Sequence, residues 1–435
     1  MFFPDWSKKI LIGAELAALA VLLLTARYGP GGTRGHAEAG AGMSAGADTT
    51  ASMDASADIS VGAGNGMNAS ADAAENGYIK WVDFTVPASV LTAAYRQDVD
   101  TYMAEHGGQE NDKASVHLNW IELLAYLAAR YGSDFGRYRE KDLTALCERL
   151  KNGESMEELT QGMKYYPYYL EAYTAVLGGM VGEYEIQVDA DEAAAFVPAD
   201  AVVSERTPQA DSAVSDGPEA PAQTAGATAA STTSPDTPKT WVTKYGLKAF
   251  LPIARYFPYE EYDDFGVSRS YGYKRQHLGH DMMGQVGTPI IAVESGRVEA
   301  MGWNQYGGWR LGIRSFDGKR YYYYAHLRQN YPYHKSLSEG SVVQAGDVIG
   351  YMGRTGYSPV ENTNNIDTPH LHFGIQLIFD ESQKEGTNEI WIDCYQLSKF
   401  LAMHRSETWR DPGTKEYSRI YAMRDPAAIE YLDEH

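Results

Sequence analysis

The stretch GTPIIAVESGRVEAMGWNQYGGWRLGIRSFDGKRYYYYAHL, residues 287–327, decides the fold class of the larger part of this chain. Apolar and polar side chains alternate along it between glycine-containing turns, which is typical of half-buried β-strands. The dipeptide Asp317-Gly318 separates two strand-like runs and indicates a tight hairpin. VVQAGDVIGYMG, residues 342–353, adds two shorter strands. We therefore predict an antiparallel all-β domain, sandwich-like or barrel-like, over residues 240–400.

Residues 78–190 show another pattern and are predicted to form a mostly α-helical domain. Apolar residues recur at three- and four-residue spacing in PASVLTAAYRQDVDTYMAEH, which starts at Pro87, and in WIELLAYLAARYGSDF, which starts at Trp120. The second segment distantly resembles the helix that carries the catalytic glutamate of lysozyme-like transglycosylases. Ala128 stands where that acid is expected, so we interpret Glu122 as a solvent-facing residue and the domain as non-catalytic.

Two stretches without apolar periodicity flank the predicted helical domain. Residues 28–77 and 191–239 are rich in Gly, Ala, Ser and Asp, and are predicted to be disordered linkers. Residues 401–435 are interpreted as a C-terminal extension of the β domain.

The N-terminal residues 1–27 carry a membrane signal. Lys8 and Lys9 precede an apolar run, Ile10–Ala26, whose length is near the lower limit of about 17 residues for a spanning helix. Glu15 interrupts the run close to its end, from where a carboxylate can reach the interface. Because the lysines favour a cytoplasmic N-terminus, we predict a single-pass membrane anchor with extracytoplasmic C-terminal domains. A cleaved signal peptide, which would make the protein secreted, is the alternative.

Charge and cysteine content exclude several function classes. The formal net charge is −21 and no basic stripe occurs, so a nucleic acid is not expected as partner. The two cysteines, Cys147 and Cys394, lie in different predicted domains, which excludes a disulfide framework and a cysteine-based zinc site. They form either a single bridge or, as we favour, two buried unpaired thiols.

Histidines gather at three places in the predicted β domain. In PHLHFGI, residues 369–375, His370 and His372 are two positions apart on a predicted strand and therefore share a face. RQHLGHDMMG places His277 and Asp281 four positions apart, and YYYYAHL ends a strand on which His326 is expected to share a face with Tyr322 and Tyr324. Neutral imidazole binds zinc and also serves as a general base. Each piece alone fits satisfied structural histidines equally well.

In this order, the three pieces resemble the M23 family of zinc metallopeptidases, the lysostaphin-like endopeptidases that cut peptide cross-links of bacterial cell walls. The resemblance covers about residues 245–380 and includes GWNQYGG and VQAGDVIGYMGRTG. It implies one Zn²⁺ per chain, and it implies site residues at these positions: His277, Asp281 and His372 as metal ligands, and His326 and His370 as catalytic histidines. Three such ligands leave a fourth position on zinc for water.

The resemblance implies an exported zinc endopeptidase acting on peptidoglycan stem peptides or cross-bridges. One alternative is a wall scaffold or binding protein that kept the fold and lost hydrolysis, against which the presence of all five residues argues. Another is an exported protease with a protein substrate. The segment YSPVENTNNIDT, residues 357–368, exceeds the family's usual turn and keeps this alternative open. The helical domain is expected to position the enzyme or to hold a protein partner.

Three further side chains lie close to these motifs. His280 is interpreted as a solvent-facing residue or a competing ligand. Tyr271 and Tyr273 are interpreted as phenol donors to the reacting oxygen or as ordinary strand aromatics.

Overall fold

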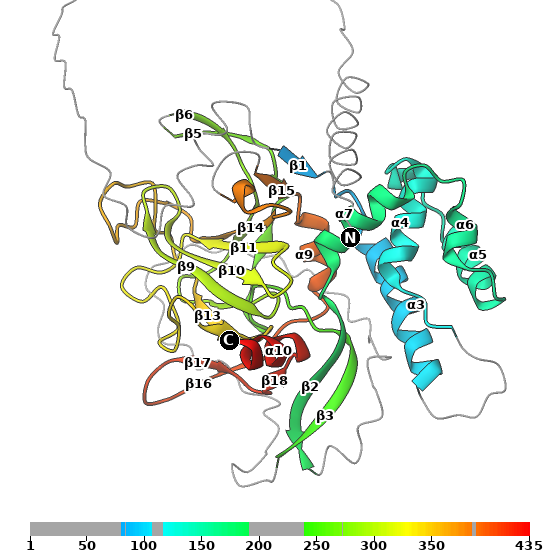
Figure 1. Cartoon of the computed structure of the whole chain (residues 1–435). Coiled ribbons are helices and arrows are strands. Elements are labelled where there is room, and N and C mark those ends of the chain that lie inside the picture. Colours follow the sequence, from blue (N-terminus) through cyan, green and yellow to red (C-terminus); the bar gives the residue numbers. More distant parts are fainter. Residues whose placement is uncertain (1–79, 83, 107–115, 191–238, 272, 385–388) are drawn as a thin grey trace, which may run out of the picture. The chain divides into compact units, whose positions relative to one another are not determined.

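The computed structural model describes residues 80–435 except 83, 107–115, 191–238, 272 and 385–388 (Figure 1). The predicted membrane anchor and nearly all of both predicted linkers lie outside these residues. In the part of the chain that is described, no helix combines the length and the apolar character needed to cross a membrane.

The larger part of the structure is built around one mostly antiparallel sheet, as predicted from the alternation in residues 287–327. Its strands follow the order β1–β15–β14–β11–β10–β9–β12, and β7 pairs with β14 and with β4. β1 and β15 are parallel, whereas the other pairs are antiparallel. The strands are β1 (Lys80–Val82), β4 (Glu260–Glu261), β7 (His280–Met283), β9 (Gly296–Asn304), β10 (Gly308–Ser315), β11 (Arg320–Ala325), β12 (Val342–Val343), β14 (His370–Leu377) and β15 (Ile390–Ile392).

Smaller strand pairs complete the β region. They are β8 (Pro289–Ile291) with β13 (Val348–Tyr351), β5 (Ser268–Tyr271) with β6 (Tyr273–Gln276), and β16 (Thr408–Arg410) with β17 (Tyr417–Arg419). The short helices are η2 (Glu381–Gln383), α9 (Tyr395–Leu401) and α10 (Pro426–Glu434). The predicted all-β fold of the peptidase-like domain is therefore confirmed in its antiparallel character.

A helical region precedes the sheet, as the three- and four-residue spacing predicted. It comprises α3 (Ala88–His106), α4 (Trp120–Tyr131), η1 (Phe135–Arg137), α5 (Glu140–Lys151), α6 (Met156–Thr160) and α7 (Tyr166–Leu177). Asn119 caps α4, because its side chain accepts hydrogen bonds from two main-chain N–H groups of the first turn, and Gly132 ends the helix at φ 65°. Glu122, expected to face solvent, is half-buried, and burial raises the pKa of its carboxyl.

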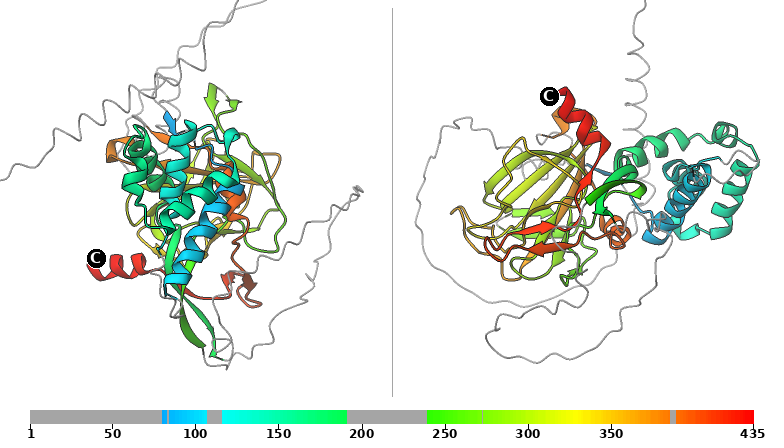
Figure 2. Two further views of the ribbon diagram at one scale, coloured as in Figure 1. Left: turned by 90° about the vertical axis from the view of Figure 1, so that its right-hand side faces the viewer. Right: turned by 90° about the horizontal axis from the view of Figure 1, so that it is seen from below.

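The helical and β regions share secondary structure and core, which the sequence interpretation did not anticipate. Residues 181–189 form a strand, β2 (Val181–Asp189), that pairs along its whole length with β3 (Lys239–Leu247). The two strands form a twisted ribbon, seen in Figures 1 and 2, and β18 (Met423–Arg424) pairs with β2. A single hydrophobic cluster contains buried residues of both regions, among them Trp120 of α4 and Phe400 of α9.

Both cysteines are buried and free, so the interpretation as two unpaired thiols is confirmed.

Candidate metal centre and active site

Three neighbouring strands bring the predicted site residues together. β14 lies between β11 and β7, and its His372 is directly opposite Asp281 of β7 and Ala325 of β11. Directly opposed residues of an antiparallel pair project from the same face, so Asp281 and His372 emerge side by side. His277 enters from the turn that precedes β7.

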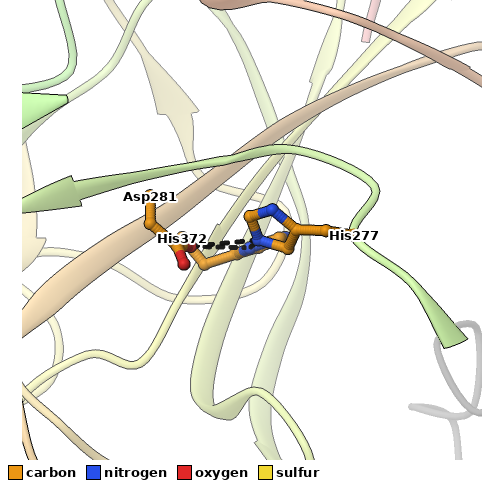
Figure 3. Close-up of side chains that lie close together, drawn as sticks. All are labelled: His277, Asp281 and His372. Carbon is orange, nitrogen blue, oxygen red and sulfur yellow. Dashed lines mark hydrogen bonds and ion pairs between the residues drawn. The ribbon is translucent and has the colours of Figure 1, made fainter. Parts of the chain in front are cut away.

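The three predicted metal ligands converge on one point (Figure 3). His277 Nε2 lies 2.8 Å from His372 Nδ1 and 3.1 Å from Asp281 Oδ1, and the last two atoms are 3.3 Å apart. A tetrahedral zinc ion with bonds of about 2.0–2.1 Å separates its ligand atoms by about 3.3 Å, so a slight expansion of the cluster accommodates one. Within the described part of the chain, His277, Asp281 and His372 form the one group of three His, Cys, Asp or Glu side chains whose potential ligand atoms all lie within 4.8 Å of one another.

Gly279 makes the convergence sterically feasible. A Cβ at this position would lie 2.4 Å from the carbonyl oxygen of Phe373 and 3.0 Å from ring atoms of His372. The backbone between His277 and Asp281 can therefore pass close to β14 only when residue 279 lacks a side chain.

Hydrogen bonds among the three side chains couple the protonation of His277 to the charge of Asp281. Burial lowers the pKa of His277, but its hydrogen bonds to Asp264 and Asp281 outweigh burial and raise the pKa to about 9. Burial raises the pKa of Asp281, but its contacts with His277 and His372 dominate and hold that pKa far below the usual range. An anionic carboxylate facing two imidazoles is a donor set in which a divalent cation can replace a proton.

The two predicted catalytic histidines lie beside this cluster. The ring centroid of His326 is 4.8 Å from that of His370 and 6.0 Å from that of His372. His326 does not continue the alternation of β11, however, because that strand ends at Ala325 and His326 has φ 60°. The expectation that His326 shares a face with Tyr322 and Tyr324 is therefore wrong.

The tyrosines of β11 divide between the two faces of the sheet. Tyr322 and Tyr324 point into the main core, where their hydroxyls donate to Glu294 and accept from the main-chain N–H of Val293, respectively. Tyr323 lies on the site's face, with its ring centroid 5.7 Å from that of His372.

Main-chain carbonyls fix the orientation of both rings. The Nδ1–H of His326 donates to the carbonyl of Thr355 at 2.9 Å, and that of His370 donates to the carbonyl of Thr368 at 2.8 Å. A carbonyl only accepts, so Nδ1 carries the proton and a neutral ring keeps its lone pair on Nε2. The Nε2 of His370 lies 3.7 Å from Asp281 Oδ1. Burial, together with the neighbouring His370 and His372, holds the pKa of His326 well below its ordinary value.

His280 is neither solvent-facing nor a ligand of this cluster. It is fully buried and packs on the other side of β7, with Nδ1 3.2 Å from Cys394 Sγ and Nε2 3.6 Å from Glu261 Oε2. Neighbouring residues of a strand point to opposite faces. Because Asp281 points toward the cluster, His280 points away from it. The side chains of Tyr271 and Tyr273 lie outside the described part of the structure.

The long segment 357–368 borders the site. The ring of Tyr357, at its start, lies 5.7 Å from that of His326. Asn362, in its middle, accepts a hydrogen bond from Trp309 Nε1 and another from the main-chain N–H of Asn330. The segment is therefore fastened to the loop that follows His326.

Sequence reasoning missed two residues that contact the cluster, Asp264 and Arg269. Neither residue lies in one of the histidine motifs. Arg269 is on β5 and Asp264 precedes that strand, and the pairing of β5 with β6 brings both close to His277.

Residues 275–385 match Peptidase family M23. The L-Ala–D-Glu endopeptidase of Bacillus subtilis is 38% identical over 131 residues, which are 30% of this chain and 38% of that protein. Lysostaphin of Staphylococcus staphylolyticus is 37% identical over 98 residues, 22% of this chain and 18% of that protein. The matched stretches thus span well under two thirds of either relative.

Among solved structures, the catalytic domain of Staphylococcus simulans lysostaphin is 30% identical with a TM-score of 0.26, covering 32% of this chain and 92% of that one. A Ruminococcus gnavus protein, a candidate glycyl-glycine endopeptidase, is 21% identical with a TM-score of 0.41, covering 72% of this chain and 91% of that one. The sequence match shows that this chain carries a peptidase family M23 domain, over residues 275–385.

Proposed function

We propose that this protein is a zinc metalloendopeptidase that hydrolyses peptide bonds in peptidoglycan stem peptides or cross-bridges. The observation that carries the proposal is the convergence of His277, Asp281 and His372 beside two histidines whose Nε2 lone pairs remain available. The names of the matched relatives, an L-Ala–D-Glu endopeptidase and lysostaphin, support the reaction class.

The donor set suits zinc. His277, Asp281 and His372 would hold one ion and leave a further position open, where the ion would act as a Lewis acid and make water a nucleophile near neutral pH. The same nitrogen and oxygen donors also bind Co²⁺ and Ni²⁺, so the identity of the metal is part of the proposal.

His370 and His326 would divide the proton handling. His370 accepts the proton of the attacking water at Nε2, while its Nδ1–H stays on the Thr368 carbonyl, and then passes that proton to the departing amine. His326 is neutral at physiological pH because its pKa is low, and its Nδ1–H is engaged with Thr355. A lone pair on Nε2 accepts rather than donates, so His326 orients the water and does not stabilise the oxyanion.

We also propose that the protein acts outside the cytoplasm, tethered by its N-terminal apolar run or secreted after cleavage. A peptidoglycan substrate requires such a location, and Lys8, Lys9 and the run that follows supply an export signal. The helical region shares a hydrophobic core with the β region, so we propose that it supports the peptidase fold in addition to any partner it holds.

The test uses the full chain in detergent, loaded with zinc, on purified peptidoglycans with either direct or glycine cross-bridges. Mass spectrometry of the released fragments identifies the bond cleaved. We expect peptide-cleaved fragments from the parent and from His334→Ala, a histidine outside the cluster, and none from His370→Ala.

Two results would contradict the proposal. Binding to the wall without release of fragments, by protein that holds one zinc per chain, would favour the scaffold. Cleavage of casein by protein that leaves the peptidoglycan uncleaved would favour a protein substrate.

A further inference from the structure

Asp264 and Arg269 form a salt bridge next to the cluster. Both lie on the segment that precedes His277, and they contact His277 and Asp281. The hairpin of β5 and β6 is closed by two main-chain hydrogen bonds, from Gly266 N to the His277 carbonyl at 2.7 Å and from His277 N to the Val267 carbonyl at 3.0 Å. These bonds extend the pairing of β5 with β6, in which Arg269 is opposite Arg275, two residues before His277.

Asp264 contacts two of the candidate ligands. The Nδ1–H of His277 lies 3.1 Å from the main-chain carbonyl of Asp264 and 3.2 Å from its carboxylate, and the main-chain N–H of Asp281 donates to the same carboxylate at 3.3 Å. Both acceptors select the His277 tautomer with the proton on Nδ1, which leaves Nε2 directed at the cluster.

Arg269 holds the second oxygen of the ligand carboxylate. Its Nη2 lies 3.2 Å from Asp281 Oδ2 and also contacts Asp264 Oδ2. Asp281 Oδ1, in contrast, faces His277 and His372. The guanidinium therefore leaves Asp281 a single oxygen for a metal ion, and it neutralises the charge of Asp264.

We propose that Asp264 and Arg269 are positioning residues of the metal centre: Asp264 fixes the His277 tautomer, and Arg269 keeps Asp281 a one-oxygen ligand. This inference rests on the proposed function, because it concerns the same zinc site. Groups that hold metal ligands from outside commonly contribute about 10–100-fold to metal affinity. Removal of an ordinary surface ion pair would change neither the zinc affinity nor the coordination of the ion.

The two residues have different expected signatures. Asp264→Asn removes a negative charge near the ion, and zinc affinity should fall about tenfold, the low end of that range, because the carbonyl of residue 264 still orients His277. Arg269→Met frees Asp281 Oδ2 and leaves more negative charge at the site, so zinc affinity should stay unchanged or increase. The freed oxygen raises the coordination number, so the visible absorption of the Co²⁺-substituted protein should weaken.

The experiment measures zinc affinity of the full chain by competition with a chromophoric chelator, and then the Co²⁺ spectrum. Arg269→Lys should restore the parent spectrum in part, because an ammonium still occupies one oxygen but lacks the planar fork. Arg255→Met is the matched control, because it removes another partly exposed arginine, paired with Glu407 outside the site.

Each failure has its own reading. If the parent holds no zinc, the proposed function itself is wrong. If the parent holds one zinc, and the Asp264→Asn affinity and the Arg269→Met spectrum both match the parent's, the inference is overturned while the proposed function stands. Melting curves identify a variant that has lost its fold. If Asp264→Asn does not fold, the Arg269 variants still test the inference, because the Arg269 side chain is partly exposed and its replacement disturbs the fold less.

Discussion

Arg320 joins the helical region to the peptidase sheet, and its removal is a stringent test of the fold described. Its side chain is 1% exposed and forms a two-bond ion pair with Glu294, at 2.8 Å from Nε and 3.0 Å from Nη2. Its Nη1 donates at 2.9 Å to the carbonyl of Ala175, in the last turn of α7, where helix carbonyls lack partners. Burial lowers the pKa of Arg320, but Glu294 outweighs it and raises the pKa, so the group is charged.

The cost of replacing Arg320 with Met follows from what would be left behind. Glu294 would keep only the hydrogen bond from Tyr322 Oη, at 2.6 Å, and the Ala175 carbonyl would lose its donor. Breaking a buried ion pair on one side costs about 3–5 kcal/mol of the free energy of unfolding. For a folded unit of this size, whose unfolding entropy is about 0.6 kcal/mol/K, that corresponds to a fall in Tm of roughly 5–8 °C.

The assay is thermal unfolding of the full chain, followed by circular dichroism in the far and near ultraviolet. Arg149→Met is the control, because Arg149 forms an exposed pair with Glu154 and should leave Tm unchanged. The double variant Arg320→Met, Glu294→Gln should be less destabilised than the sum of the two single variants, since the second change removes the stranded charge. A fall in Tm no larger than that of Arg149→Met would refute the assignment of Arg320 as a buried link between the regions.

Other side chains allow equally direct tests. Gly279→Ala should displace the ring of His372 and lower kcat/KM by roughly 100-fold, and unchanged activity and zinc content would argue against the close approach described. Burial raises the pKa of Glu389 from 4.5 to about 7, so the folded state binds its proton more tightly than the unfolded state does. Stability should therefore fall as pH rises from about 4.5 to 7, by on the order of 3 kcal/mol, and Glu389→Gln should lose this dependence; parallel Tm profiles of the two proteins would contradict it. Tyr245→Phe removes a 2.7 Å hydrogen bond to the buried carboxylate of Asp98 and should lower the free energy of unfolding by about 1.5–3 kcal/mol, measured by denaturant titration.

The three candidate ligands could be named from sequence because the order of the histidine motifs resembles the M23 family; His277 and His372 lie 95 residues apart, and no single motif identifies the set. Alternation alone places His370 and His372 on one strand face, whereas the close approach of Gly279 to β14 is a finding of the structure. His326 shows the limit of this reasoning. Its orientation depends on a positive φ and on the carbonyl of Thr355, neither of which follows from the alternation of the preceding strand.

The pairing of β2 with β3 could not be predicted from the local sequence pattern, for a different reason. Tyr184, Ile186 and Val188 alternate with polar residues, so the strand itself had a readable signal that the helical interpretation passed over. Its partner, however, lies on the far side of residues 191–238, and composition alone assigns that stretch to a linker. A linker between two segments therefore does not show that they belong to separate domains.

The shared core gives the helical region a structural role at the peptidase. β11 carries Arg320 at its beginning and ends one residue before His326, so the strand that leads to a candidate catalytic histidine is tied at its start to α7. In the same hydrophobic cluster, α9 follows β15 and places Phe400 against Tyr95 of α3 and Trp120 of α4, with ring centroids 5.8 Å and 5.7 Å apart. These aromatic contacts, and the hydrogen bond from the buried Arg320 to α7, join the helical and β regions into a single folded unit. The part of the chain that matches the peptidase family thus shares its hydrophobic core with residues that lie outside the match.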